Sequence, residues 1–187
     1  MAIAINGSGT VTGISVGGLP DGIVDTDMIA AEAVTNVKQG PGSVIQVVRA
    51  PNSQANARTS HNSTTFNSGG IYQSFTPIKS DSLIIVYGHV ATYIDSGGTY
   101  GEYTISPDGT AANADTSQSV WFGSVTDTDE WDSLPFSYSH TSGSTNARTY
   151  QLFVKRHSGS GYVYTGWSSS PGSTRNGGEM WIMEVVV

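Results

Sequence analysis

The balance of aliphatic side chains is the feature that most limits how this chain can fold. Valine and isoleucine together occur 30 times, whereas leucine occurs only 4 times. Branching at Cβ suits the pleated surface of a sheet, while leucine packs well in helices. The ratio therefore predicts an all-β fold and argues against a helical bundle.

Charge and cysteine content exclude several classes of protein. The 187 residues carry a formal charge of −7 and include no cysteine. A chain without cysteine has no disulfide framework, thiolate nucleophile or cysteine-ligated zinc site. An acidic chain without a basic cluster suits a phosphate backbone poorly, so we expect no nucleic-acid binding. No apolar run approaches the roughly 18 residues of a membrane span, so we expect no membrane insertion.

The first 43 residues differ in composition from the rest. Residues 1–22 are rich in glycine and carry no aromatic residue, so this segment cannot bury a core of its own. Residues 24–38 place apolar side chains near helical spacing, and a Gly-Pro-Gly sequence follows them. We therefore expect an extended arm over residues 1–43 that contains one short helix over 24–38.

From residue 44 onward, short β-branched and aromatic runs alternate with turns rich in Gly, Ser, Pro and Asp. The longest run, residues 83–94, is apolar on both faces, which is typical of a central strand covered on both sides. The last run ends on three valines, which predicts a buried, central final strand. The expected strands are residues 44–50, 71–76, 83–94, 100–105, 119–125, 134–139, 147–157, 161–166 and 179–187. They predict a single antiparallel β-sandwich over residues 44–187.

Several segments match short patterns of a known family in the order that the family has them. They are GSVIQVV (42–48), GIYQSFTPI (70–78), KSDSLIIV (79–86), RTYQLFV (148–154) and MEV (183–185), preceded by linker-like GLPDG (18–22) and VDTDMIA (24–30). In these segments the chain resembles bacteriophage tail-fibre-type virion proteins. The resemblance implies a trimeric fibre whose C-terminal, jelly-roll-like knobs bind a host surface.

On this resemblance we expect a virion protein that works by adhesion. Residues 1–43 would attach to other virion proteins and register a homotrimer, and residues 44–187 would form a knob that binds host surface carbohydrate. The main alternative is a capsid decoration or tail-structural subunit, whose arm grips the shell while the knob only caps it. A carbohydrate-active enzyme and a cellular lectin-like module are further alternatives.

Aromatic side chains are the best candidates for a glycan site. Ring faces stack on sugars, while neighbouring Asp, Asn and Arg side chains hydrogen-bond the hydroxyls. Nine rings lie near expected strand ends or beside polar loops: Tyr93, Tyr100, Tyr103, Trp121, Trp131, Tyr138, Tyr162, Tyr164 and Trp167. At least half of the rings are expected to be core or rim residues. We select Tyr100, Tyr103, Trp131 and Trp167 as the glycan-binding set.

Motifs for catalysis and for metal binding are weak. The four histidines lack the i, i+2 or i, i+4 spacing of metal ligands, so no metal site is expected. The Gly-x-Ser-x-Gly sequence at 13–17 lacks the strand and helix of a nucleophile elbow. A glycosidase would need a carboxylate pair, such as Glu102 with Asp95 or Asp108. The acidic loop 127–132 lacks the pattern of a helix–loop–helix calcium site, although calcium binding there stays open. We expect no enzyme, no catalytic residue and no cofactor.

Overall fold

The computed structural model describes residues 4–5, 11–12, 35, 38–50, 58–111, 116–123, 130–166 and 177–187. The chain divides into two compact units, Met1–Gln39 and Gly40–Val187. In the first unit, β1 (Ala4–Ile5) pairs antiparallel with β2 (Val11–Thr12). The expected helix over 24–38 lies outside the described residues, except for Thr35 and Lys38.

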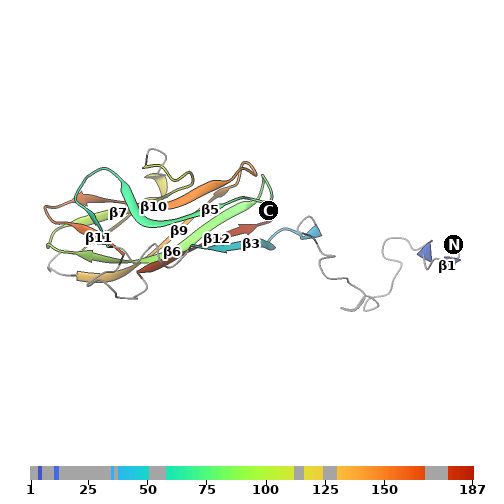
Figure 1. The fold of residues 1–187 in the computed structure, drawn as a ribbon, viewed down its shortest axis with the longest axis horizontal. Coiled ribbons are helices and arrows are strands. Elements are labelled where there is room, and N and C mark those ends of the chain that lie inside the picture. The colour runs from blue at the N-terminus through green and yellow to red at the C-terminus, as the bar shows by residue number, and fades with distance from the viewer. Residues whose placement is uncertain are drawn as a thin grey trace. The chain divides into compact units, whose positions relative to one another are not determined.

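The second unit, which we call the knob, is an antiparallel β-sandwich (Figure 1). One sheet has four strands in the order β5 (Asn67–Phe75), β10 (Arg148–Ser158), β7 (Tyr100–Ser106) and β8 (Val120–Gly123). The other has six strands: β3 (Val44–Arg49), β12 (Gly178–Val185), β6 (Leu83–Ile94), β11 (Val163–Thr165), β4 (Thr59–His61) and β9 (Glu130–Thr141). A short 3-10 turn, η5 (Thr116–Gln118), precedes β8. The structure thus confirms the expected fold class.

The strands largely follow the expected runs. Strand β6 has the expected bounds, and β12 lies between β3 and β6, which confirms that the final strand is central. Strand β9 is longer than expected and pairs with β6 along its whole length. Strand β4 was not expected, because its sequence Thr-Ser-His has no apolar alternation.

The sequence predicts that both faces of β6 are covered, but in a single copy the two faces differ. Ile84, Val86 and Val90 are fully buried and face the four-stranded sheet, whereas Tyr87, on the opposite face, is 38% exposed. Leu83 and Ile85 share that outer face and are half-buried. Strand β6 is central within its sheet, but among the described residues only one of its faces lies in the core.

The core closes around large side chains from both sheets. Tyr150 is fully buried, and its ring meets that of Phe75 edge to face at 6.2 Å. Burial raises the pKa of Tyr150 to about 12, and its hydroxyl hydrogen-bonds His140 Nε2 at 2.8 Å. Gly88 interrupts the apolar run of β6 for a steric reason, since a Cβ there would lie 2.0 Å from the Glu179 carbonyl oxygen. Close packing of the central strands therefore requires glycine at that position.

A fully buried carboxylate joins four of the segments that carry the family resemblance. Glu184 accepts hydrogen bonds from the backbone amides of Ile78 (2.8 Å to Oε2) and Lys79 (2.8 Å to Oε1). The hydroxyl of Ser82 donates to Glu184 Oε1 at 2.7 Å. With its amide oriented to donate, Gln46 adds a contact of 3.2 Å to Oε2. One hydrogen-bond network thus connects segment 183–185 with segments 42–48, 70–78 and 79–86, and it holds the loop between β5 and β6.

Candidate functional site

Three tyrosines, an arginine and an aspartate gather at one end of the six-stranded sheet. We call Arg58, Tyr93, Asp95, Tyr162 and Tyr164 the aromatic cluster. The Arg58 guanidinium carbon lies 3.7 Å from the centre of the Tyr164 ring and 4.7 Å from that of Tyr93. The Tyr162 and Tyr164 rings stack at 5.8 Å with an interplanar angle of 25°, and the Tyr93 and Tyr164 ring centres are 5.4 Å apart. The cation and the rings form one continuous surface group.

Strand register brings these residues together from distant parts of the chain. Tyr164 of β11 pairs with Tyr93 of β6 on one side and with Ser60 of β4 on the other. Directly opposed residues of antiparallel strands share a face, so Tyr93 and Tyr164 point the same way. Arg58 immediately precedes β4, and Tyr162 stands two residues before Tyr164, which places both beside the pair.

Asp95 orients the tyrosines of the cluster. Its Oδ1 accepts the backbone amide of Tyr162 at 2.7 Å, and its Oδ2 accepts the hydroxyl of Tyr164 at 3.2 Å. Partial burial and the nearby Asp95 charge raise the pKa of Tyr164, so its hydroxyl stays protonated and donates. Gly161 allows this approach, because a Cβ there would lie 2.7 Å from Asp95 Oδ1. The result is a group of rings whose polar edges are held in place.

A buried histidine supports the cluster from beneath. His61 is 1% exposed, and its Nε2 lies 2.9 Å from the hydroxyl of Thr165, which donates to the Gly69 carbonyl at 3.1 Å. Because the Thr165 proton is used in that bond, Thr165 accepts from His61, so Nε2 carries the ring proton. His61 Nδ1 is buried with no hydrogen-bond partner among the described residues. Burial lowers the pKa of His61 to about 4, so the ring is neutral at pH 7.

Acidification is expected to destabilise the knob through His61. The folded-state pKa of about 4 lies below the unfolded value near 6.5, so the unfolded chain binds the extra proton between these pH values. The contribution of His61 is therefore complete above pH 6.5 and is lost as pH falls towards 4. Between pH 7 and pH 5 it lowers the free energy of unfolding by about 2 kcal/mol. Urea unfolding at both pH values measures the loss.

The His61→Leu variant is the control for this pH dependence. It keeps the Thr165 to Gly69 hydrogen bond and all other histidines, and it removes only the buried imidazole. Between pH 7 and pH 5, the free energy of unfolding of the variant should fall by about 2 kcal/mol less than that of the wild type. Equal losses in the two proteins would assign the pH dependence to other groups.

Of the four residues selected from the sequence, Tyr100 and Tyr103 lie in the other sheet and away from the aromatic cluster. Trp131 of β9 pairs in register with Tyr93, so its backbone adjoins the aromatic cluster. Tyr100 begins β7 in the other sheet and is half-buried. Tyr103 is a core residue, 5% exposed, whose hydroxyl donates to the Pro135 carbonyl at 2.8 Å, and its ring has no free face for a sugar. Trp167 lies outside the described residues.

Tyr93, Tyr162 and Tyr164 belong to the nine rings noted in the sequence but not to the four expected to bind glycan. The spacing of Tyr162 and Tyr164 was an available signal, because residues two apart in a strand share a face. Arg58 lies outside any regular pattern in the sequence, and only strand pairing places it over the rings. Asp95 was considered as half of a catalytic carboxylate pair rather than as a support for tyrosine.

A second polar cluster lies on the four-stranded sheet. Glu102 is 6% exposed, and its Oε2 lies 3.0 Å from Lys155 Nζ and 3.0 Å from His157 Nδ1. Burial opposes ionisation of Glu102, but hydrogen bonds from Lys155, Ser119 and His157 and the Lys155 charge outweigh it and lower its pKa. A carboxyl held ionised in this way is a poor general acid.

The carboxylates considered for glycoside hydrolysis occupy separate hydrogen-bond networks. Glu102 bonds Lys155 and His157, Asp95 bonds the tyrosines, and Asp108 accepts the hydroxyls of Ser106 and Thr110 at 2.7 and 2.9 Å. Each is occupied by neighbours of its own.

Across the described ranges, no three His, Asp or Glu side chains gather as metal ligands. The greater part of the acidic loop 127–132 lies outside these ranges. None of the described helices has the length and hydrophobicity needed to cross a membrane.

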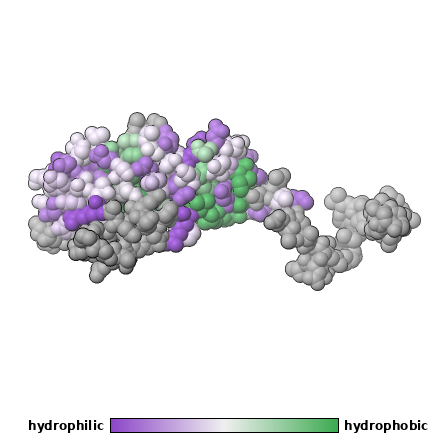
Figure 2. Space-filling view, viewed as in Figure 1, coloured by the Kyte–Doolittle hydropathy of each residue, from purple (hydrophilic) through white to green (hydrophobic). Residues whose placement is uncertain are grey.

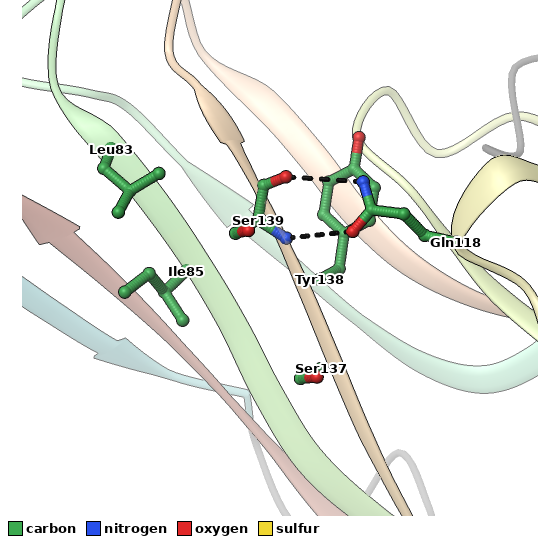
Figure 3. Close-up of a pocket in the computed structure, with 6 residues that line it drawn as sticks. All are labelled: Leu83, Ile85, Gln118, Ser137, Tyr138 and Ser139. Atoms are coloured by element: carbon green, nitrogen blue, oxygen red, sulfur yellow. Dashed lines mark hydrogen bonds between the residues drawn. The ribbon is translucent and has the colours of Figure 1, made fainter.

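A shallow pocket of about 240 Å³ lies along β9 (Figure 3). It is lined by Leu83, Ile85, Gln118, Ser137, Tyr138 and Ser139. Leu83 and Ile85 project from β6, while Gln118 reaches the backbone of Ser139 from the other side of β9. Its lining carries no carboxylate, histidine or lysine, so it offers contact surface rather than acid–base chemistry.

The aromatic cluster is the arrangement best suited to bind a ligand. Tyr162 is 40% exposed and extends the stacked rings to the surface. Ring faces contact the apolar faces of sugars, while the Arg58 guanidinium and the Asp95 carboxylate, which both contact Tyr164, can donate to and accept from sugar hydroxyls. The cluster therefore combines the two kinds of contact that a carbohydrate site needs.

Comparison with known proteins gives little further information. No protein-family model and no curated protein matches the chain. Among solved structures, the chain is similar to the structure of infectious bursal disease virus, Gx strain, with 12% identity and a TM-score of 0.34. It is also similar to a mutant VP2 protein of the same virus, with 14% identity and a TM-score of 0.35. Both matches cover 75% of this chain and 36% of the viral chain, so the chain spans about a third of their length. Values this low do not place it in a family.

Proposed function

We propose that this chain is a virion structural protein, an adhesin of the tail-fibre type whose knob binds a host surface glycan through the aromatic cluster. The family resemblance of the sequence supports the virion assignment. The observation that carries the binding role is the aromatic cluster itself, a group of stacked tyrosines flanked by Arg58 and Asp95.

The position of the cluster in the knob also supports this function. The chain enters the knob beside its C-terminus, because Gly42 donates to the Val186 carbonyl at 2.7 Å and Val186 donates to Ser43 at 2.9 Å. Figure 1 places β11, which carries Tyr164, at the opposite end of the knob. Strand β6 runs between the two ends, and its length from Leu83 to Tyr93 is about 33 Å. Attachment at one end and contact at the other is the arrangement that an adhesin requires.

Adhesion of this kind depends on multivalent binding. A shallow sugar site of millimolar affinity supplies about 4 kcal/mol. We propose that the chain forms a homotrimer and that residues 1–43 attach this trimer to other virion proteins. Several binding sites per particle then raise the effective affinity by about 10²–10⁴. Each copy carries a net charge of −7, so long-range attraction to an anionic polymer is unfavourable and recognition is short-range. The proposed activity is binding without catalysis and without a cofactor.

The test uses the purified full chain on immobilised lipopolysaccharide, capsular polysaccharide and teichoic acid, and on the bacteria that carry them. We expect binding to one polysaccharide class, competition by the same polysaccharide in solution, and no release of cleaved product. Stabilisation of virus particles without any cell or glycan binding would instead establish a decoration subunit. Product release that disappears in Glu102→Gln would establish an enzyme.

A further inference from the structure

The outer face of the six-stranded sheet carries a continuous apolar surface at the end where the chain enters the knob. Register places the side chains in rows across β3, β12 and β6: Val47 with Met183 and Ile85, and Val44 with Val185 and Leu83. A third row aligns Arg49, Trp181 and Tyr87. We call the eight apolar residues of these rows the apolar face. They are Val44, Val47, Leu83, Ile85, Tyr87, Trp181, Met183 and Val185.

This face is accessible in a single copy of the chain. Val44 is 47% exposed, Val47 is 49% exposed and Tyr87 is 38% exposed. Figure 2 shows hydrophobic side chains gathered at the end of the knob where Figure 1 places β3 and the C-terminus. Single exposed apolar residues are ordinary, but contiguous apolar patches on a protein surface mark sites of association.

Two edge strands of this sheet, β9 and β3, differ in a way that indicates where another chain approaches. Edge strand β9 is closed by side chains: Gln118 bonds both the amide and the carbonyl of Ser139, each at 3.4 Å. Further along β9, Pro135 has no amide proton, and its carbonyl accepts the Tyr103 hydroxyl at 2.8 Å. These devices prevent pairing of β9 with a further strand.

Edge strand β3 has no such closure among the described residues. Ala50 donates towards β12, to the Met180 carbonyl at 2.8 Å. Because backbone groups alternate in direction along a strand, those of Val47 and Arg49 point away from β12. Unpaired backbone groups beside exposed valines favour pairing with another strand over exposure to solvent. The apolar face and the open edge are therefore adjacent parts of one surface.

Charge favours a second copy of this chain as the occupant. Among the residues that the structure describes, the one ion pair beside the apolar face joins Arg49 to Glu179 at 2.6 Å, and its two charges cancel. The whole chain carries −7, so contact between copies through acidic surfaces is repulsive, whereas contact through this face buries no unpaired charge. The chain also enters the knob beside this face, at Gly42 and Ser43. Copies attached through residues 1–43 would therefore hold their apolar faces at high local concentration.

We infer that the apolar face and the open edge of β3 form the interface between copies of this chain. The inference rests on the proposed assembly and names the surface that holds it together. In a trimer the three apolar faces surround a common axis, and each aromatic cluster lies on the same face of its sheet at the far end of β6. Burial of Val47 and Met183 against a neighbouring copy removes from water the apolar surface that a single copy exposes.

The test compares two valines of matched exposure on edge strands of the full-length chain. Val47 of β3 is 49% exposed and Val120 of β8 is 47% exposed. Sedimentation velocity at about 20 µM is expected to show an oligomer for the wild type and for Val120→Lys. Val47→Lys is expected to sediment as a monomer with an unchanged circular dichroism spectrum, because a lysine in the interface buries a charge.

The outcomes distinguish this interface from the assembly itself. A monomeric wild type overturns both the inference and the proposed trimer. An oligomer that persists in Val47→Lys assigns assembly to residues 1–43 and overturns the inference alone. If Val47→Lys does not fold, amide hydrogen exchange of the wild type, measured across protein concentrations, tests the interface instead. Amides of β3 must gain protection as the oligomer forms, while those of β8 must not, and equal protection at all concentrations overturns the inference.

Discussion

Replacement of Glu184 by alanine is expected to destabilise the knob by about 3–5 kcal/mol and to lower its melting temperature by roughly 10 °C. The carboxylate is fully buried and accepts the backbone amides of Ile78 and Lys79 and the Ser82 hydroxyl. Removal of the carboxylate leaves the two amides without this acceptor, and each such partly buried group costs about 1–3 kcal/mol, whereas the Ser82 hydroxyl can still donate to the Lys79 carbonyl at 3.0 Å. Domains of this size are stable by only about 5–15 kcal/mol, so the change removes a large share of the total.

A second glutamate in the same strand provides the control. Glu179 is half-exposed and bonds only the exposed Arg49 side chain, so Glu179→Ala is expected to cost less than about 1 kcal/mol. Glu184→Gln should fall between the two, because one amide oxygen still accepts while the amide nitrogen faces donors. Urea unfolding at pH 7 measures all three. Equal stabilities for Glu184→Ala and Glu179→Ala would show that the buried network is not a stabilising element.

Replacement of Tyr164 by alanine is expected to weaken glycan binding at least about tenfold per site, which corresponds to about 1.4 kcal/mol. Tyr164 is the centre of the aromatic cluster: its ring contacts those of Tyr93 and Tyr162 and lies 3.7 Å from the Arg58 guanidinium. Its loss removes the stacking surface and frees Arg58 to leave its position. If attachment is multivalent as proposed, the effect on cell attachment should exceed the effect on one site.

The measurement is the dissociation constant of the folded variant for the polysaccharide that the wild type binds. Tyr164→Phe keeps the ring and loses only the hydrogen bond to Asp95, so its affinity should fall by no more than a few-fold. Tyr72→Ala is the matched control, since Tyr72 is 48% exposed on β5 of the other sheet. Wild-type affinity in Tyr164→Ala would show that the glycan binds elsewhere.

The alternation of apolar and polar residues along the chain made most of the strands predictable. Strand β6 was anticipated to the residue, because its β-branched and aromatic run is bounded by turn residues on both sides. Strand β4 was missed, because three polar residues become a strand only when β11 supplies hydrogen bonds to them. The bounds of β9 were too narrow for the same reason, since pairing with β6 extends it beyond its apolar centre.

For the candidate site, the sequence predicted only the kind of residue. Aromatic rings were expected at loop-proximal strand ends, and Tyr93, Tyr162 and Tyr164 are such rings. Tyr103 belongs to the same category in the sequence, yet it faces the core. The sequence shows which residues of a strand share a face, but it does not show which of the two faces is buried. It therefore does not distinguish a core ring from a surface ring.

The amino-acid sequence by itself determined the class of the fold and the central position of the last strand. These follow from the β-branched content and from period-two patterns, which depend on neighbouring residues only. The tertiary structure alone decided which face of β6 is open, which tyrosines meet Arg58, and what Glu184 holds. Those contacts join residues that are between 30 and 140 positions apart, and their geometry is set by which strands pair and in which register.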